Sequence, residues 1–161
     1  KRAFDQDHNN ADANYAMGMV SGKMTDVETE NKKIVAFVKD AKIYSDRAVA
    51  INPNHARATY SIGKWHSEMV NLSGIKKAAV KLFYGGLPNG DLDSAIVYFE
   101  KCRLLDPYFA VKYLDLAKAY RDNHRPTQAI EVLNKLLKLP LRTGDDAAIK
   151  AEGAKMLDAI Q

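Results

Sequence analysis

Apolar residues recur along this chain every three or four positions, and no segment alternates apolar and polar residues for long. This period is typical of amphipathic helices, so the pattern predicts an all-α fold. The longest apolar series predicts a helix over about residues 32–51. Its inward side chains are expected to be Ile34, Val35, Val38, Ala41, Ile43, Ala48 and Ile51. The polar stretch 24–33 in front of it predicts a loop or a frayed helix end.

Proline and glycine separate the remaining helices. Asn52-Pro53, Asp106-Pro107 and Pro140 each end a helix, because proline lacks an amide hydrogen and disfavours helical backbone at the preceding residue. Residues 85–90, Gly-Gly-Leu-Pro-Asn-Gly, are the strongest loop signal. The other expected helices cover about residues 11–23, 56–71, 74–84, Asp91 or Asp93 to Leu105, 109–122, 127–139 and 144–160.

A pattern of small and aromatic residues returns along the chain in three copies. The clearest copy comprises Ala110, Val111, Lys112, Tyr113, Leu116, Ala117, Tyr120, Ala129 and Leu133. Such a repeat is a helix pair that cannot bury its apolar face alone, so neighbouring pairs stack and function belongs to the stacked surface. We therefore predict a single domain over residues 1–161. It contains repeat 1 at about 11–53, repeat 2 at 56–107 with an inserted helix at 74–84, repeat 3 at 109–140, and a capping helix at 144–160.

This signature, with Asn52-Pro53 and Asp106-Pro107 closing two of the units, resembles the tetratricopeptide family. A narrower resemblance covers about residues 11–160 and rests on Ile62-Gly63-Lys64-Trp65-His66, Asn71-Leu72-Ser73, Lys76-Lys77-Ala78-Ala79, Leu82-Phe83, Ala95, Tyr98-Phe99, Lys101, Leu105-Asp106-Pro107, Phe109, Leu139-Pro140, Thr143 and Asp145-Asp146. These stretches resemble the regulator of microtubule dynamics family. The chain departs from it at Gly63-Lys64-Trp65-His66, where Gly-Arg-Trp-Cys is usual, and at Gly74, where an aromatic residue is common.

The resemblance implies a tetratricopeptide-like right-handed α–α superhelix with helical insertions and a C-terminal capping helix. Eukaryotic members of the family are linked to microtubules and to organelle contacts, and bacterial relatives of unknown role exist. The Asn, Asp and Ala content of this chain is compatible with a bacterial relative. The expected function is non-catalytic binding of a protein or peptide on the concave face, and an adaptor at microtubules or membranes is an alternative by family analogy.

In a tetratricopeptide stack, the first helix of each pair lines the concave groove. Carried over position by position, the groove residues are Asp12, Tyr15, Met19, Arg57, Tyr60, Lys64, Ser67, Val111, Leu114, Lys118 and Arg121. Their lysines and arginines predict a basic groove that suits an acidic or C-terminal peptide. Such side chains are also common on solvated helix surfaces, so the assignment depends on the repeat geometry.

The inserted helix carries a second candidate surface. Ile75, Ala78, Ala79, Leu82 and Phe83 form a stripe at helical spacing, with Lys76, Lys77 and Lys81 outside it. A basic amphipathic helix can lie on an anionic membrane or meet a partner, whereas packing on the neighbouring repeat is the simpler use of so short a stripe. The insertions also leave a lipid or hydrophobic-ligand carrier as an alternative, with Trp65, Phe83 and Leu87 near a closed cavity.

Composition argues against several other classes. The net charge of +4 is spread at helical spacing, so no nucleic-acid partner is expected. Cys102 is the single cysteine and the histidines lack ligand spacing, so neither a disulfide nor a metal site is expected. No glycine-flanked nucleophile or phosphate loop is present, and the paired carboxylates Asp91/Asp93 and Asp145/Asp146 are explained by helix starts. We expect no enzyme, no cofactor, and a monomer or a weak homodimer.

Overall fold

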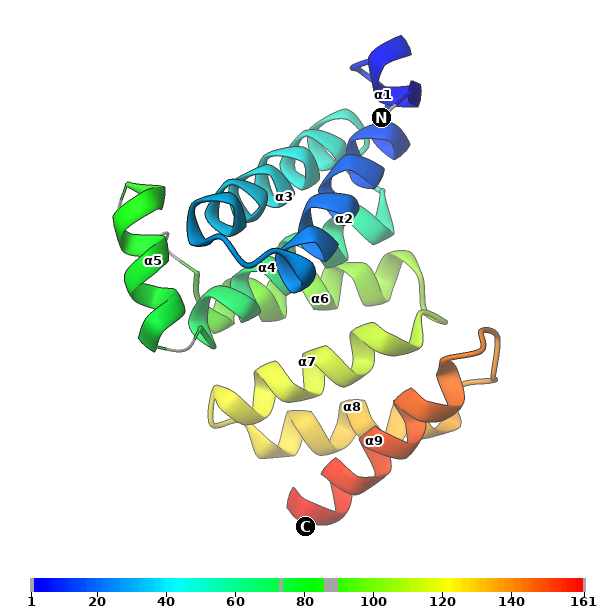
Figure 1. Ribbon diagram of the computed structural model, residues 1–161. Coiled ribbons are helices and arrows are strands. Elements are labelled where there is room, and N and C mark those ends of the chain that lie inside the picture. Colours follow the sequence, from blue (N-terminus) through cyan, green and yellow to red (C-terminus); the bar gives the residue numbers. More distant parts are fainter. Residues whose placement is uncertain (1, 73, 86–89, 161) are drawn as a thin grey trace.

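The computed structural model describes residues 2–72, 74–85 and 90–160, and for residues 74–76 the backbone alone. Every regular element in these ranges is an α-helix, which confirms the all-α fold (Figure 1). The helices are α1 (Arg2–Gln6), α2 (Ala11–Val27), α3 (Asn31–Ile51), α4 (Ala56–Val70), α5 (Gly74–Tyr84), α6 (Leu92–Leu105), α7 (Ala110–Asp122), α8 (Pro126–Lys138) and α9 (Asp146–Ile160).

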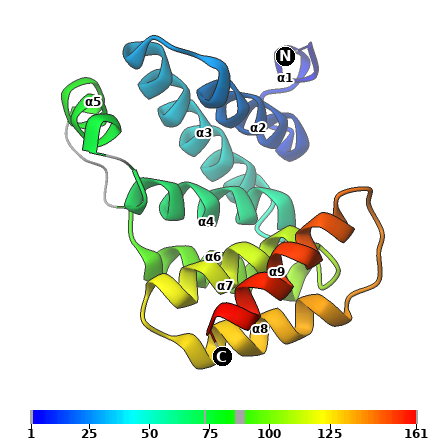
Figure 2. The ribbon, with the colours of Figure 1, turned by 60° about the horizontal axis from the view of Figure 1, so that its bottom comes forward.

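Three helix pairs are stacked from one end of the molecule to the other (Figures 1 and 2). α2 packs on α3, α4 on α6, and α7 on α8. α3 also contacts α4, and α6 contacts α7, so the pairs join into one stack that α9 closes by lying against α7 and α8. α5 stands at the edge of the stack, against α3. The assignment of these pairs as tetratricopeptide repeats stays a prediction.

Polar side chains cap several helices where the sequence supplies them. Asn10 accepts a hydrogen bond from the amide of Ala13 at 2.9 Å, and Asp91 accepts one from Ser94 at 2.6 Å. Both are N-cap bonds, and the second confirms one of the two caps expected for α6. In front of α9, the carboxylate of Asp146 accepts the amide of Thr143 at 2.9 Å, one of the bonds of a capping box.

Residues 24–33 were predicted as a loop or a frayed helix end, and the loop alternative is wrong. α2 continues to Val27 and α3 begins at Asn31, so only residues 28–30 connect them. The carboxylate of Glu28 accepts the amides of Thr29 at 2.8 Å and Glu30 at 3.0 Å, which closes a short turn. The polar residues that suggested a loop belong to helix ends, because a surface helix needs no apolar residue on its solvated side.

The largest group of buried apolar side chains lies in the C-terminal half. Phe99 of α6, Leu116 of α7 and Leu133 of α8 are fully buried, and the group continues to Met156 and Leu157 of α9. Burial of side chains of this size stabilises the fold by about 1.5–3 kcal/mol each. This core joins α6, α7, α8 and α9 into one packed unit.

One apolar face of α3 differs from its prediction. Val35 and Ala48 are buried as expected, but Ile43 and Ile51 are 45% and 41% exposed. Ser45 is buried instead. Residues 35, 38, 45 and 48 share one face of a helix, and residues 43 and 51 fall on the opposite face. The prediction that Ile43 and Ile51 point inward is therefore wrong, because it considered their hydrophobicity and not their position around the helix axis.

The inserted helix, α5, covers the predicted residues, but its apolar stripe does not pack on the neighbouring helix. Val80, which lies outside the predicted stripe, is 3% exposed. Leu82 and Phe83, which belong to the stripe, are 73% and 42% exposed. The expectation that the stripe serves packing is therefore wrong for the residues whose side chains are described.

Candidate partner-binding cleft

α2 and α4 meet at their N-terminal ends. The Nε2 atom of His55, the N-cap of α4, lies 3.0 Å from Oδ1 of Asp12 in α2. The His55 ring also lies 5.0 Å from the ring of Tyr15. Because Nδ1 of His55 accepts the amide of Ala58 at 3.1 Å, the neutral ring carries its proton on Nε2 and donates it to Asp12. These contacts fix the two helices together at one end.

Beyond that junction lies a cleft of about 600 Å³ between α2, α3 and α4, which we call the α2–α4 cleft. Its lining residues are Gly18, Met19, Gly22, Lys23, Thr25, Asp26, Ile34, Val38, Ala41, Ser45, Tyr60, Ser61, Lys64, Trp65, Glu68, Met69 and Leu72. Large apolar side chains from all three helices are among them, and charged residues come from α2 and α4. A concave, largely apolar surface with a few polar groups is typical of binding sites.

Two glycines of α2 have different roles in the cleft. A Cβ atom at Gly18 would lie 3.0 Å from Oγ of Ser45 and 3.2 Å from the carbonyl oxygen of Ala41, so Gly18 allows α2 to approach α3 closely. A Cβ atom at Gly22 would meet nothing within 4 Å. Helix packing therefore does not require Gly22, which leaves open space on the cleft wall.

A polar network connects the cleft to the C-terminal half. The hydroxyl of Tyr60 donates to Oδ2 of Asp115 at 2.6 Å, and Nζ of Lys64 lies 3.4 Å from the same oxygen and 3.0 Å from Glu68. Burial, with the charge of Asp115, raises the pKa of Tyr60 far above its usual range, so the phenol stays protonated and donates. Burial alone would lower the pKa of Lys64, but Asp115 and Glu68 outweigh it and the pKa is raised. Lys64 therefore stays charged and is already partnered.

Trp65 is half-buried in the cleft wall. Its Nε1 atom donates to the carbonyl oxygen of Val38 at 3.1 Å, which attaches α4 to α3. The neighbouring His66 stacks on Tyr98 of α6, with ring centroids 5.9 Å apart and planes at 13°. Burial lowers the pKa of His66 and Lys42 lowers it further, against the opposing effect of Asp91, so the ring is neutral at neutral pH. Trp65 thus lines the cleft, whereas His66 packs between α4 and α6.

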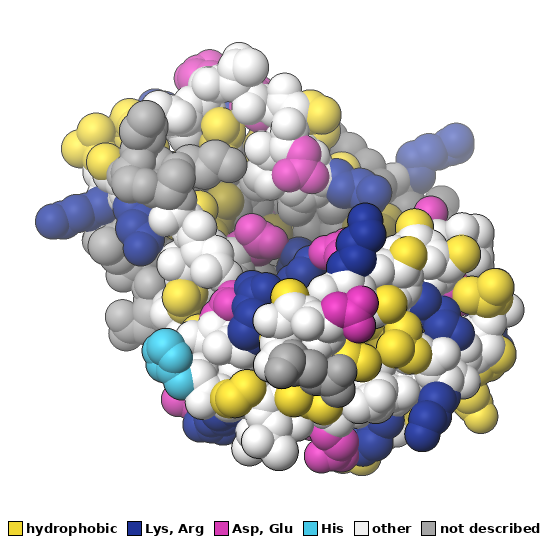
Figure 3. Space-filling model, turned by 90° about the horizontal axis from the view of Figure 1, so that it is seen from below, with side chains coloured by type: hydrophobic (Ala, Val, Ile, Leu, Met, Phe, Trp, Pro, Cys, Tyr) yellow, Lys and Arg dark blue, Asp and Glu magenta, His cyan; other side chains and the backbone are white. Residues whose placement is uncertain are grey.

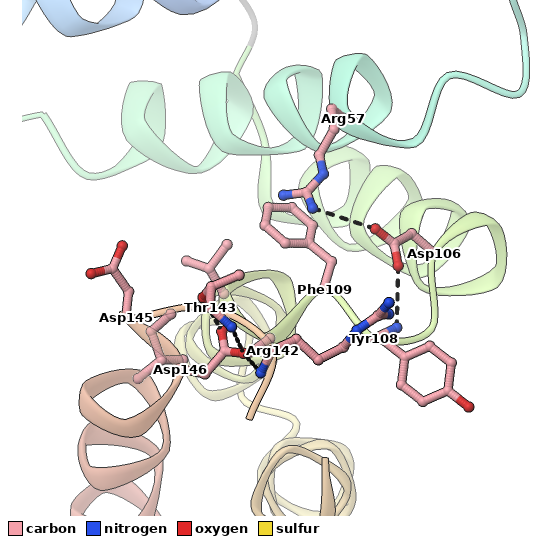
Figure 4. Close-up of a pocket in the computed structure, with 11 residues that line it drawn as sticks. Arg57, Asp106, Tyr108, Phe109, Arg142, Thr143, Asp145 and Asp146 are labelled. Carbon is pink, nitrogen blue, oxygen red and sulfur yellow. Dashed lines mark hydrogen bonds and ion pairs between the residues drawn. The ribbon is translucent and has the colours of Figure 1, made fainter. Parts of the chain in front are cut away.

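A second cavity, of about 710 Å³, lies between the first turn of α4, the turn after α6 and the start of α9 (Figure 4). The guanidinium of Arg57 lies 3.5 Å from the centre of the Phe109 ring and 3.6 Å from the carboxylate of Asp106. Arg142 lies over the ring of Tyr108 at 5.1 Å. Both guanidinium groups are thus stacked on aromatic rings of this chain. The α2–α4 cleft, with its larger apolar lining, is the better candidate for a partner site.

The predicted groove residues do not form one continuous surface. Met19, Tyr60 and Lys64 line the α2–α4 cleft, and Arg57 and Val111 line the second cavity. Tyr15 lies at the junction of α2 with α4, beside His55, and is not part of either lining. The concave residues are therefore divided between two cavities.

The remaining predicted groove residues lie outside both cavities. Leu114 is a core residue, 3% exposed, so its prediction as a contact residue is wrong. Ser67 is half-buried on α4 and Arg121 is exposed at the end of α7. Lys118 pairs with Glu152 of α9 at 2.7 Å. Leu114 was misplaced because the C-terminal core also covers the first helix of the α7–α8 pair.

The expected basic groove is a surface of paired charges. The four predicted cations have carboxylate partners: Arg57 with Asp106, Lys64 with Asp115 and Glu68, Lys118 with Glu152, and Arg121 with Asp122. In the face shown in Figure 3, Lys and Arg side chains are interspersed with Asp and Glu around the central hollow. A partner therefore meets both signs of charge and no uniform positive field.

Sequence reasoning missed Asp115, which is the anionic partner of Tyr60 and Lys64. Its side chain is only 8% exposed. The signal was present, because Asp115 stands between Leu114 and Leu116 in a stretch where apolar residues continue on both sides. A carboxylate inside such a stretch must have a partner if it is buried.

Three observations on the described part of the chain concern metal ligands, the cysteine and membrane spans. In it, no group of three or more His, Cys, Asp and Glu residues is placed to hold a metal ion. Cys102 is buried, and burial raises the pKa of its thiol to about 11, so it is protonated and inaccessible. Among the same residues, no helix is both long enough and apolar enough to cross a membrane.

Stacked helix pairs with an open, apolar-lined cleft define the class as an all-α, helical-repeat-like protein. The comparison with protein families gives the family itself. The family described as "Regulator of microtubule dynamics protein 1-3" matches residues 1–161. This chain belongs to that family.

Individual relatives agree with this assignment. Regulator of microtubule dynamics protein 1 from Bos taurus is 26% identical over 159 residues, which are 98% of this chain and 50% of the relative. The Homo sapiens protein 1 is 24% identical over 99% of this chain and 51% of its own length. Protein 3 from Xenopus laevis is 26% identical over 98% of this chain and 34% of the relative. The chain thus spans about half or less of these relatives. They are animal proteins and give no support to a bacterial origin.

Proposed function

We propose that this chain is a non-catalytic protein-binding module whose α2–α4 cleft holds an amphipathic segment of a partner. In this proposal its three helix pairs are tetratricopeptide-like repeats. The observation that carries it is the cleft itself, which combines an apolar lining with charged residues of both signs. A helical or extended peptide with one apolar face is the ligand that fits such a groove.

The lining suggests how the partner is recognised. Met19 and Met69 supply flexible side chains that adapt to an apolar surface, and Trp65 supplies a rigid one. A uniformly acidic peptide would compete with Asp115 and Glu68 for Lys64. We therefore propose a segment with a mainly apolar contact face and mixed charges at its edges, in place of the acidic peptide expected from the predicted groove residues.

The identity of the partner is proposed from the names of the relatives in this family. The relatives are named as regulators of microtubule dynamics. We place the partner of this cleft in the microtubule system, with the tubulin polymer as the first candidate. This step rests on the family name, whereas the position of the site rests on the cleft.

A matched pair of glycine variants tests the proposal. Gly22→Leu fills the cleft wall at a position where an added Cβ atom meets nothing within 4 Å, so the fold should persist. Gly144→Leu adds the same side chain in open space near the second cavity and serves as the control. Co-sedimentation with tubulin polymers should weaken at least about tenfold for Gly22→Leu and stay unchanged for Gly144→Leu. Equal binding by both variants would contradict the cleft, and no binding by the wild type would contradict the microtubule partner.

A hydrophobic-ligand carrier is the second candidate, because the same apolar lining could receive an acyl chain. The sequence-based carrier hypothesis expected Trp65, Phe83 and Leu87 near a closed cavity. Trp65 lines the cleft and Phe83 is exposed on α5, whereas Leu87 lies outside the described residues. Native mass spectrometry before and after organic extraction separates the two functions. A bound mass that disappears on extraction and is absent from Gly22→Leu supports a carrier; a clean protein mass contradicts it.

A further inference from the structure

α5 is attached to the stack by one face. Val80 is 3% exposed, and α5 contacts α3. On that side Nζ of Lys39 lies 4.7 Å from the centre of the Tyr84 ring and 3.5 Å from the carbonyl oxygen of Phe83. Positions 80 and 84 are one helical turn apart, so they define the side of α5 that faces α3.

The opposite side of α5 is apolar and faces outward. Ala78 is exposed, and Leu82, one turn further on, is 73% exposed. Phe83, at the edge between this side and the side that faces α3, is 42% exposed. Full burial of a large apolar side chain contributes roughly 1.5–3 kcal/mol, and Leu82 forgoes most of this while Phe83 forgoes part of it, which suggests that something covers this face.

The charges of α5 are of one sign. Its sequence, GIKKAAVKLFY, contains three lysines and no acidic residue. Elsewhere a lysine pairs with a carboxylate one turn away, as Lys42 does with Asp46 and Lys135 with Glu131. Lys77 and Lys81 have no such neighbour within α5, and both are exposed.

We propose that the outward face of α5 is a docking surface for an anionic lipid bilayer. The helix would lie parallel to the membrane, with Leu82 and Phe83 among the acyl chains and Lys77 and Lys81 at the phosphates. An apolar face next to flexible cations is the pattern of interfacial helices. A protein partner fits less well, because a stable protein interface buries about 800 Å² per side, far more than one short helix face presents. Docking through α5 is independent of the α2–α4 cleft.

Vesicle sedimentation tests this surface. The wild type should bind vesicles of phosphatidylcholine with phosphatidylserine, weakly bind pure phosphatidylcholine, and lose binding as salt is added. Lys77→Gln with Lys81→Gln should lower the partition coefficient about twenty-five-fold, since each lysine at the surface accounts for about a fivefold change. Lys138→Gln with Lys155→Gln, the same charge change on α8 and α9, should lower it less than about twofold.

A single apolar variant completes the test. Leu82→Gln preserves helix propensity and alters an exposed side chain, so it should fold normally yet bind the anionic vesicles about tenfold more weakly. Equal binding to both vesicle types, or equal loss in both lysine pairs, would overturn the proposal. So would sedimentation velocity showing that the wild type dimerises and Leu82→Gln does not, because the face would then belong to a second copy of this chain.

Discussion

The C-terminal helices α6–α9 and the N-terminal helices α2–α4 bury their contacts in different ways. The C-terminal half is held by large apolar side chains such as Phe99, Leu116 and Leu133, all fully buried. Between α2 and α3 most buried residues are small or polar, such as Asn14, Gly18 and Ser45, and the larger apolar ones are Val35 and Val38. Small residues bring helices close together but fill little volume, so the N-terminal half keeps a cleft where the C-terminal half has a core.

The difference suggests that the two halves of the stack have different roles. Large side chains in α6–α9 supply most of the hydrophobic stabilisation, because it grows with the apolar area removed from water. The N-terminal helices leave Met19 exposed and Trp65 half-buried along the cleft, and Met69 is a largely buried part of its lining. We infer that stability resides mainly in one half and recognition in the other.

The strongest test of this comparison is a truncation in each half. Phe99→Ala should lower the free energy of unfolding by about 3–5 kcal/mol, because it opens a cavity in the filled core. Val35→Ala, at a site in α3 that is 2% exposed, should lower it by only about 1–2 kcal/mol. Urea denaturation followed by circular dichroism measures both. Equal losses would show that the two halves are packed alike.

Adding a methyl group should have opposite effects where α4 packs on the C-terminal core and where α2 borders the cleft. A Cβ atom at Gly63 would lie 2.8 Å from the ring of Phe99, so Gly63→Ala should destabilise the protein by about 1–3 kcal/mol. Gly22→Ala meets nothing within 4 Å and should stabilise α2 by about 0.5–1 kcal/mol. Thermal melts of both variants decide the sign, and a destabilised Gly22→Ala would mean that the cleft wall is already filled.

A buried charge in the C-terminal half should make its stability depend on pH. Lys112 is fully buried, and its ammonium donates to the carbonyl oxygen of Asp106. Burial lowers its pKa from 10.5 to about 8, so between these values the unfolded chain holds a proton that the folded protein has lost. Stability should therefore rise with pH in this window, by about 2 kcal/mol between pH 8 and about pH 9.5.

Lys112→Met provides the reference for that measurement, because it retains the buried stem without the titrating group. The difference in unfolding free energy between the wild type and this variant should move in favour of the wild type as the pH rises. Chemical denaturation at several pH values measures it. A difference that is flat with pH would show that Lys112 keeps an ordinary pKa in the folded protein.

The smallest effect on stability is expected at the surface ion pair that joins α7 to α9. Lys118 of α7 lies 2.7 Å from Glu152 of α9, and both side chains are partly exposed. Lys118→Ala should change stability by less than about 0.5 kcal/mol, because solvent and salt screen such pairs. A larger loss, measured by the same denaturation, would mean that α9 depends on this pair more than on Met156 and Leu157.

Helix positions were readable from the sequence wherever a proline or an N-cap residue marked an end. Asp91 caps α6 as expected, and α3 ends at Ile51 before Asn52-Pro53. The orientation of short stripes was not readable. α5 turns Leu82 outward because Val80 meets the stack, and the local pattern is compatible with either side.

The site was predicted only in part for a related reason. Met19, Tyr60 and Lys64 were found because the resemblance to tetratricopeptide proteins assigns one side of the first helix in each pair to the groove, and these three line the α2–α4 cleft. Their pairing was not found, since Tyr60 and Asp115 are separated by 55 positions along the chain. Leu114 was misassigned because spacing alone does not show which face of α7 the core covers.

The most direct test of the cleft uses Trp65, which is the single tryptophan of the chain. Labelling with 5-fluorotryptophan gives one ¹⁹F signal that reports on the cleft wall even in the presence of unlabelled tubulin. If the α2–α4 cleft holds the partner, the signal should shift or broaden as tubulin is added, and Gly22→Leu should abolish the change. An unchanged Trp65 signal under conditions where the chain co-sediments with the polymer would contradict the account and place the contact elsewhere on the molecule.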